Sequence, residues 1–415
     1  MIILSLYIYL GKGIAYGYFA ESLLLIGLIL LVKERRKIDV INSRSAKILY
    51  LLLVVNLLYI FRGTLEFSFL DTLRDGFIFN YVIFSFLLLL FIDDIQKFVQ
   101  SILYIYKYYA FILFILYILS LNGFIGSISL FGNIHLLFFK FGDISVHLFI
   151  SFIFQISGLN KYKKPLDLVN LILIFLMFSV ASSYSRGGML SFILAFIVFY
   201  KYSRSVIIKQ RLKQYFKYLP FVLIFSVLFL STFKVNQNFQ GRAVGVDQVA
   251  NNFTSIFTTT DEGALNDNKI WRLLWWGKII DYTFNGPYFA MGKGLGLSLA
   301  DDDEILTTDL EGELRSPHNF NLTILARYGV FIFFIWIYWI VRQLKRLRDK
   351  SLSNLNLILI CIQIAFLFNA SFDVFLEGPM GAFPFWVFVG LDLIFEFYGY
   401  YNAKQELAIF EQTTQ

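Results

Sequence analysis

Three residues that lie far apart in the chain have side chains suited to a single reaction. Arg186 stands in "SSYSRGGML" (182–190), Arg272 in "NDNKIWRLLWWGKII" (266–280) and His318 in "RSPHNFNLTILARYGVFIF" (315–333). A guanidinium group binds phosphate oxygens with two hydrogen bonds, so a pair of arginines suits a diphosphate. A neutral imidazole accepts the proton of a hydroxyl. Together they predict group transfer from a diphosphate-linked donor, provided that the fold brings them together.

His318 precedes an apolar stretch, at the start of a predicted helix. We expect Ser316 to be the N-cap and Pro317 the first helical residue. The positive end of the helix dipole disfavours an imidazolium there, and the exposed backbone amides attract an anion. Each residue also has a simpler interpretation. In this interpretation His318 is a hydrogen-bonded histidine at a span entrance. Arg186 is a snorkelling side chain at a helix end, and Arg272 is a solvated side chain on a packing helix.

Residues 266–280 predict a short amphipathic helix. Helical spacing places four side chains near one face: Arg272, Trp275, Trp276 and Ile279. Because tryptophan prefers the headgroup zone, we expect this face to lie on the membrane surface, with Arg272 close to lipid phosphates.

Membrane helices must position these residues. The 415-residue chain is 58% hydrophobic and only 16% charged, with a mean hydropathy of +0.67, whereas soluble domains carry about 25% charged residues. Its 49 Phe and 25 Tyr exceed what a packed aqueous core uses. Apolar runs close to the roughly 20 residues of a bilayer crossing recur along the chain. The sequence therefore predicts an all-α, polytopic integral membrane protein.

We expect eleven transmembrane helices, and residues 1–10 would add a short twelfth, so the number stays at eleven or twelve. The expected spans are 14–32, 45–61, 76–92, 103–122, 146–160, 167–183, 188–203, 218–234, 322–341, 353–369 and 384–400.

Basic clusters fall in alternate gaps between these spans, at 33–37, 161–164, 201–217 and 342–350. The positive-inside rule assigns these gaps to the cytoplasm. The net charge of +7 is then explained without nucleic acid, which we do not expect as a partner. The same topology places all three candidate residues at the outer face.

The chain divides into three predicted parts: N-terminal transmembrane helices (1–234), a large periplasmic loop with short helices (235–321) and C-terminal transmembrane helices (322–415). A loop of this length is usually functional. We interpret its acidic run at 301–304 as solvated rather than as a cation site. Transporter-like repeats are not evident, and the single cysteine, Cys361, excludes an internal disulfide.

We expect His318, Arg186 and Arg272 to be the catalytic residues, and no metal ion or other cofactor. The candidate substrate-binding residues are Arg186, Arg272, Asn319, Trp275, Trp276 and Glu377. A second lipid-linked substrate would need further cations, for which the loop offers Arg242, Lys269, Lys278, Lys293 and Arg315.

Three segments between residues 182 and 333 resemble, in order, motifs of the O-antigen ligase and O-antigen polymerase superfamily of bacterial inner membranes. "SSYSRGG" is similar to its Ser-Arg-Gly turn, and "WRLLWWGKIIDYTFNGPYFAMGKGLG" to its loop arginine, aromatic helix and Gly-x-Gly segment. "SPHNFNLTILARYGVFIF" is similar to its His-Asn-x-x-Leu helix start with a Gly turn. The order of the three motifs along the chain carries the resemblance.

The resemblance implies metal-independent glycosyl transfer on the periplasmic face of the inner membrane. The donor would be an undecaprenyl-diphosphate-linked oligosaccharide, with Arg186 and Arg272 binding the diphosphate and His318 activating the acceptor hydroxyl. The segment "DVFLEGPMGAFPFWVFVGL" (373–391) looks more like the polymerase branch. We therefore expect a polysaccharide polymerase whose acceptor is another lipid-linked repeat unit. Membrane lipids and a chain-length regulator are candidate partners.

Three alternatives remain. An O-antigen ligase would use the lipid A core as acceptor and would share the three motifs. A non-enzymatic flippase for lipid-linked glycans would need a charged central cavity, yet few charges fall within the expected spans. An oligosaccharyltransferase of the same superfamily would act on a protein, but no additional domain for such an acceptor is evident.

Overall fold

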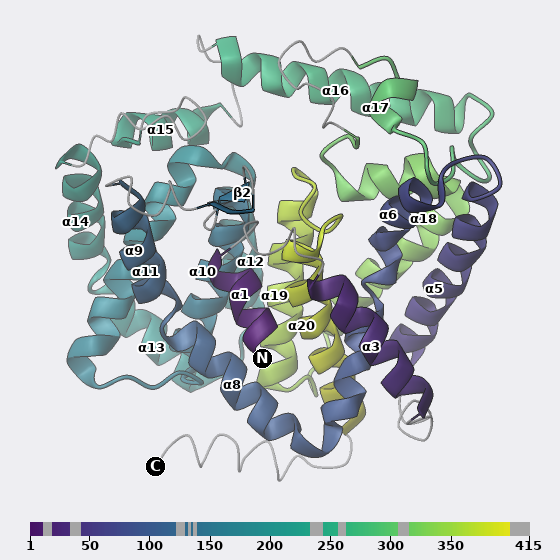
Figure 1. Cartoon of the computed structure of the whole chain (residues 1–415). Helices are drawn as coiled ribbons and strands as arrows, with labels where there is room; N and C mark the ends of the chain where they lie inside the picture. Colours follow the sequence, from purple (N-terminus) through teal and green to yellow (C-terminus); the bar gives the residue numbers. More distant parts are fainter. Residues whose placement is uncertain are drawn as a thin grey trace.

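The computed structural model describes residues 1–10, 19–33, 43–121, 129–131, 134–135, 139–232, 244–255, 263–305 and 315–398. In these ranges the regular secondary structure is helical apart from a short antiparallel hairpin of β1 (Ser129–Phe131) and β2 (Ile134–His135) (Figure 1). The predicted all-α fold class is confirmed.

The helices fall into three groups along the chain. The N-terminal group is α1 (Ile2–Leu10), α3 (Phe19–Lys33), α5 (Arg44–Gly63), α6 (Phe69–Asn80), α7 (Ile83–Leu87), η1 (Leu88–Asp94), α8 (Ile95–Lys107), α9 (Tyr109–Leu121), α10 (Phe141–Ser157), α11 (Lys164–Tyr184), α12 (Arg186–Tyr202), α13 (Val206–Phe216) and α14 (Leu219–Thr232). The next group is α15 (Val246–Thr254), α16 (Gly263–Phe284) and α17 (Leu299–Asp302). The last is α18 (Phe320–Arg346), α19 (Asn354–Ala370) and α20 (Pro379–Tyr398). Each expected span overlaps one or more of these helices.

Four helices in the described ranges are long and apolar enough to cross a membrane: α5, α11, α18 and α20. The number rises to six if two bent pairs are each one span, α6 with residues 83–107 (54°) and α13 with α14 (50°). Other expected spans are shorter apolar helices, namely α9, α10 and α19. The chain is thus a polytopic membrane protein whose helices are often shorter and more bent than the hydropathy pattern indicates.

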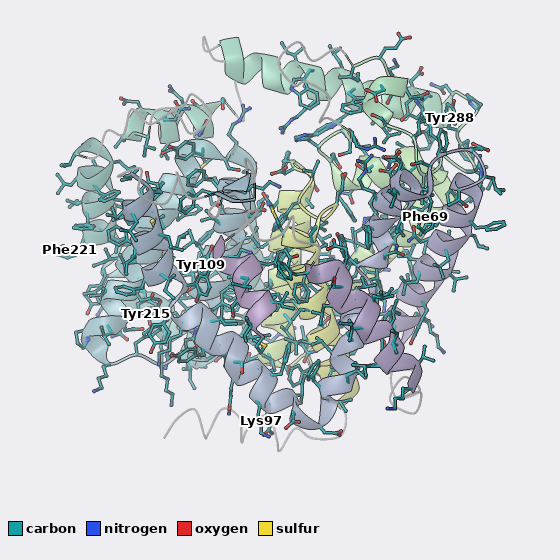
Figure 2. All side chains as sticks on the ribbon, viewed as in Figure 1. Phe69, Lys97, Tyr109, Tyr215, Phe221 and Tyr288 are labelled. Carbon is teal, nitrogen blue, oxygen red and sulfur yellow. The ribbon has the colours of Figure 1, made fainter. Side chains whose placement is uncertain are left out.

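The two ends of the molecule agree with the topology derived from the basic clusters. Figure 2 places Lys97, from an expected inner gap, at the end of the molecule opposite Tyr288, from the expected outer loop. Helices α15, α16 and α17 lie at the Tyr288 end, where α16 runs across the other helices (Figure 1). The division of the chain at residues 235 and 321 stays a prediction.

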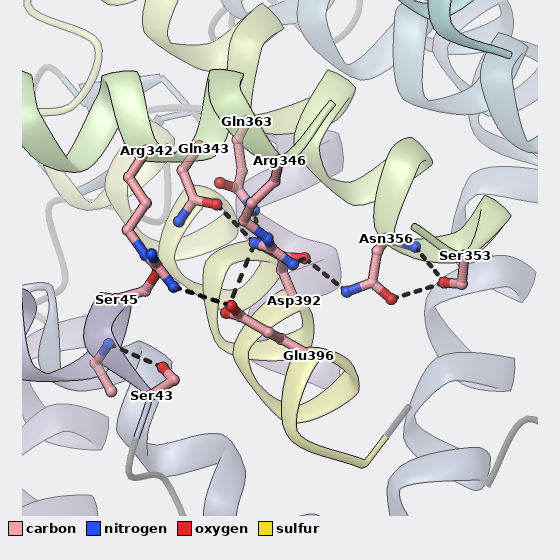
Figure 3. A network of polar contacts seen from close by, with 11 residues as sticks. Ser43, Ser45, Arg342, Gln343, Arg346, Ser353, Asn356, Gln363, Asp392 and Glu396 are labelled. Carbon is pink, nitrogen blue, oxygen red and sulfur yellow. Dashed lines mark hydrogen bonds and ion pairs between the residues drawn. The ribbon is translucent and has the colours of Figure 1, made fainter. Parts of the chain in front are cut away.

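A polar network ties the C-terminal ends of α18 and α20 together (Figure 3). Arg346 binds both oxygens of Asp392, at 2.6 and 3.1 Å. Arg342 donates to Glu396 at 3.3 Å and to Ser45 of α5 at 2.9 Å. Removing one partner of such a buried pair leaves an uncompensated charge, which is strongly destabilising. The network fixes the C-terminal ends of these two helices, whose N-terminal ends approach the candidate site.

Helix α16 packs against the protein with the face on which we expected lipid. Trp275 and Ile279 are fully buried and pack with Leu299, Ala300, Leu325, Ala326 and Val330. The expected membrane orientation of this face is therefore wrong. Apolar side chains of α17 and α18 offer a closer-packed partner than headgroups do, and the indole of Trp275 finds a hydrogen-bond acceptor there, Asp303 Oδ2, at 2.6 Å.

Candidate functional site

The turn Ser371–Asp373, between α19 and α20, is the place where the candidate residues meet. Arg272 Nη1 donates to the carbonyl oxygen of Phe372 at 2.9 Å. His318 Nδ1 lies 4.0 Å from Asp373 Oδ1. At the N-terminus of α12, a Cβ on Gly187 would lie only 2.9 Å from Phe372 Cβ. The small residue after Arg186 thus lets α12 approach the turn that binds Arg272.

Arg272 and His318 are direct neighbours. Arg272 Nη2 lies 3.5 Å from His318 Nδ1. Trp271 contacts both: its ring is 5.3 Å from the guanidinium carbon and meets the imidazole edge to face, with centroids 5.7 Å apart. We did not single out Trp271 in the sequence. Its position next to Arg272 in "WRLLWW" is the sequence feature that indicates it as a site residue.

His318 does not occupy the position that the sequence predicts. The N-cap of α18 is Asn319, whose Oδ1 accepts hydrogen bonds from the backbone amides of Asn321 and Leu322 at 3.1 and 3.2 Å. The prediction that Ser316 caps the helix is wrong, because asparagine caps equally well and the chain turns sharply first. His318 has a φ of 53°, a left-handed conformation that is uncommon for a non-glycine residue.

Surrounding groups hold the turn that carries His318. Trp276 Nε1 donates to the carbonyl oxygen of Pro317 at 2.8 Å. Thr323 donates to Glu377 Oε1 at 2.8 Å. Burial raises the pKa of Glu377, while hydrogen bonds from Ser316 and Thr323 work against this rise. Strained backbone persists where its surroundings over-determine it, and these contacts supply that constraint.

The four additional candidates for substrate binding therefore hold other residues of the site in place. Asn319 caps α18, Trp276 holds Pro317, and Glu377 holds the residues on either side of His318. Trp275 is fully buried, and its ring packs against that of Trp271, with centroids 6.0 Å apart. We therefore retain Arg272 and His318, with Arg186 at the N-terminus of α12 next to the same turn, as the residues that would face a substrate.

Asp373 and Lys140 join the site without any prediction from the sequence. Lys140 Nζ lies 3.1 Å from Asp373 Oδ2 and 3.6 Å from Asp143 Oδ1. Burial would raise the pKa of Asp373, but the charges of Lys140 and His318 outweigh it and hold the pKa below its ordinary value. Asp373 is thus an ionised carboxylate. It attracts an imidazolium at His318, whereas the adjacent Arg272 opposes one.

Helix α15, which we did not predict, holds the turn before Arg186. Asn252 Nδ2 donates to the carbonyl oxygens of Ser182 and Ser183 at 2.8 and 2.7 Å. Arg186 Nη1 donates to Ser255 Oγ at 3.2 Å. The segment between α14 and α18 therefore contributes to the position of two guanidinium groups, that of Arg186 through α15 and that of Arg272 through α16.

Three of the five further loop cations, those whose side chains the structure describes, make internal contacts. Lys293 pairs with Asp302 and Asp303, each at 2.6 Å, and Lys278 donates to the Asp303 carbonyl oxygen. Arg315 lies 3.4 Å from Asp75. The side chains of Arg242 and Lys269 lie outside the described residues. The acidic run is not a simple solvated face either, since Asp303 is buried and paired with Lys293.

Comparison with known proteins identifies a family that part of the chain matches. Residues 171–337 match the family model of O-antigen ligase, and this stretch contains Arg186, Arg272 and His318. The match confirms the resemblance seen in the three motifs. The searches of curated proteins and of solved structures found no significant match.

Proposed function

We propose that this chain, whose residues 171–337 belong to the O-antigen ligase and polymerase superfamily, is a polysaccharide polymerase. It transfers a glycan from an undecaprenyl-diphosphate carrier to a sugar hydroxyl of another lipid-linked repeat unit. The reaction takes place on the periplasmic face of the bacterial inner membrane. The observation that carries this proposal is the contact of Arg272 with His318 at 3.5 Å, beside the α12 N-terminus that bears Arg186.

The chemistry follows from the residue types. The acceptor oxygen attacks the anomeric carbon of the donor sugar, and the bond from that carbon to the diphosphate oxygen breaks. The acceptor proton passes to an imidazole nitrogen of His318. The electron pair of the broken bond leaves with the carrier diphosphate, whose increased charge Arg186 and Arg272 stabilise. Two fixed arginine charges supply this stabilisation without a metal ion, so a chelator should not affect the rate.

Asp373 completes the proposed mechanism as a positioning residue. Its ionised carboxylate lies 4.0 Å from His318 Nδ1. A small rotation of the imidazole, which moves Nδ1 from Arg272 toward Asp373, would let this nitrogen donate to the carboxylate and leave Nε2 to take the acceptor proton. A base oriented by a third group is the general arrangement for activating a hydroxyl.

Asp373→Asn should slow transfer by roughly tenfold to more than a hundredfold, since a charged hydrogen bond contributes about 1.5–3 kcal/mol. Its pH–rate profile should also shift, because the carboxylate no longer stabilises the imidazolium. Asp373→Glu should partly restore both properties. Asp301→Asn, at an exposed carboxylate of α17, is the matched control. An unchanged pH profile in Asp373→Asn would show that the residue acts only on structure.

The choice of polymerase over ligase rests on the resemblance of residues 373–391, and the products of a deletion strain test it. Without a polymerase, a separate ligase still attaches one repeat, so the strain should show lipid A core with a single unit. Without a ligase, bare core and long carrier-linked chains should accumulate. We expect the single-unit pattern, and bare core with accumulated polymer would identify the chain as the ligase. A chain-length regulator remains a proposed partner.

A further inference from the structure

Helix α16 has a second apolar face, opposite the one that carries Arg272. Five large apolar side chains on it are exposed: Ile270 (52%), Leu273 (53%), Leu274 (69%), Ile280 (47%) and Phe284 (45%). Steps of three or four residues connect them through Gly277, so they form one stripe along the helix. Lys278 borders the stripe on one edge, and Asp281, four residues after Gly277 and three before Phe284, lies within its C-terminal half. Exposed apolar patches of this kind mark an interaction surface.

The stripe continues into the lipid-facing surface of a membrane span. The ring of Phe284 meets that of Phe289 edge to face, with centroids 6.2 Å apart. Phe289 in turn meets Phe331 of α18 at 5.9 Å. Phe331 and Phe334 are 60% and 55% exposed on a helix that is long and apolar enough to cross the membrane. Three aromatic rings thus connect the α16 stripe to a surface that faces hydrocarbon.

We propose that this stripe of α16 contacts the outer leaflet of the bilayer and that the helix lies at the membrane surface. The helix lies across the outer ends of the other helices rather than alongside them (Figure 1). Interfacial helices bury an apolar face at the boundary between headgroups and acyl chains and keep charges at its edge. Lys278 occupies such an edge. The Trp275 face packs inward and the opposite face meets lipid, the reverse of the orientation expected from the tryptophans.

A consequence concerns Arg272, and it rests on the proposed function. One face of α16 contacts lipid while the other presents Arg272 to the site. The depth at which the helix lies would then set the height of this guanidinium relative to the headgroup plane, where a carrier diphosphate travels.

Single-cysteine labelling tests the lipid contact itself. The one native cysteine, Cys361, is buried, so cysteines introduced at the surface can be labelled selectively. Leu274→Cys and Ile280→Cys would each carry an environment-sensitive fluorophore in protein reconstituted into phosphatidylethanolamine and phosphatidylglycerol vesicles. Phe334→Cys is the lipid-facing reference and Asp301→Cys the water-facing one. Quenching is measured with acyl-chain-brominated lipid and with aqueous iodide.

We expect the labels at 274 and 280 to be quenched by brominated lipid several-fold more than the label at 301, and to approach the label at 334. Iodide should show the reverse order. Stripe labels that behave like the label at 301 would overturn the proposal. Labels shielded from both quenchers, with cross-linking between Leu274→Cys chains, would also overturn it and identify the stripe as an interface between copies. Neither result depends on the proposed catalytic activity.

Discussion

Replacement of His318 by alanine is expected to slow glycan transfer by a factor of about 10²–10⁴, the usual contribution of a general base. The side chain adjoins Arg272 and Asp373 but lies outside the hydrogen-bond ladder of α18. Its loss should therefore leave membrane insertion and donor binding nearly intact. Transfer by the wild-type protein should also weaken in acid, because an imidazolium accepts no proton.

The measurement compares single-turnover rates for wild-type and His318→Ala proteins at equal amounts in vesicles. Binding of the lipid-diphosphate donor is measured separately for each protein. A variant that binds donor normally and transfers at the wild-type rate would remove His318 from the mechanism. A variant that neither binds donor nor remains folded calls for His318→Gln, which keeps a polar side chain at the same turn and should show the same loss of rate.

Arg272→Ala and Arg186→Ala should each slow transfer by roughly tenfold to more than a hundredfold. A charge-assisted hydrogen bond in a poorly solvated site contributes about 1.5–3 kcal/mol. Lysine keeps the charge but lacks the planar fork that binds two oxygens. We therefore expect Arg186→Lys and Arg272→Lys to remain impaired, and the measurement is the rate of carrier diphosphate release at saturating acceptor.

Arg62→Ala provides the matched control for both arginines. Arg62 lies in the last turn of α5 and contacts the sulfur of Met291 at 3.8 Å, so its loss changes the same net charge without touching the Ser371–Asp373 turn. Equal rates for Arg62→Ala and Arg272→Ala would mean that only overall charge matters. Wild-type rates in correctly inserted Arg186→Ala and Arg272→Ala would exclude both arginines from diphosphate binding.

Local and periodic features of the sequence predicted the helical membrane fold and the order of its helices. The apolar runs indicated where the helices lie. Hydropathy did not predict the bends between α6 and α7 and between α13 and α14. The three motifs pointed to Arg186, Arg272 and His318 because these residue types have distinct chemistry. The structure places Arg272 against His318 and sets Gly187, next to Arg186, against Phe372.

Features that depend on distant partners were beyond the sequence. Asp373 gains its role from Lys140, which precedes α10, and no spacing rule connects them. The tryptophans of α16 indicated a headgroup contact, but two apolar faces were available and packing against α17 and α18 decided between them. Likewise Lys293 and Arg315 looked available for a second diphosphate until their carboxylate partners were placed beside them.

Reconstituted transfer tests the central claim most directly. Purified protein in vesicles receives a lipid-diphosphate-linked donor and a labelled lipid-linked acceptor, in the presence of a chelator, and the extended glycan and released carrier diphosphate are measured together. The proposed mechanism predicts one carrier diphosphate released per sugar bond formed by the wild-type protein, and a loss of both products in His318→Ala. Undiminished transfer in His318→Ala, or extension of the acceptor without release of carrier diphosphate, would contradict it.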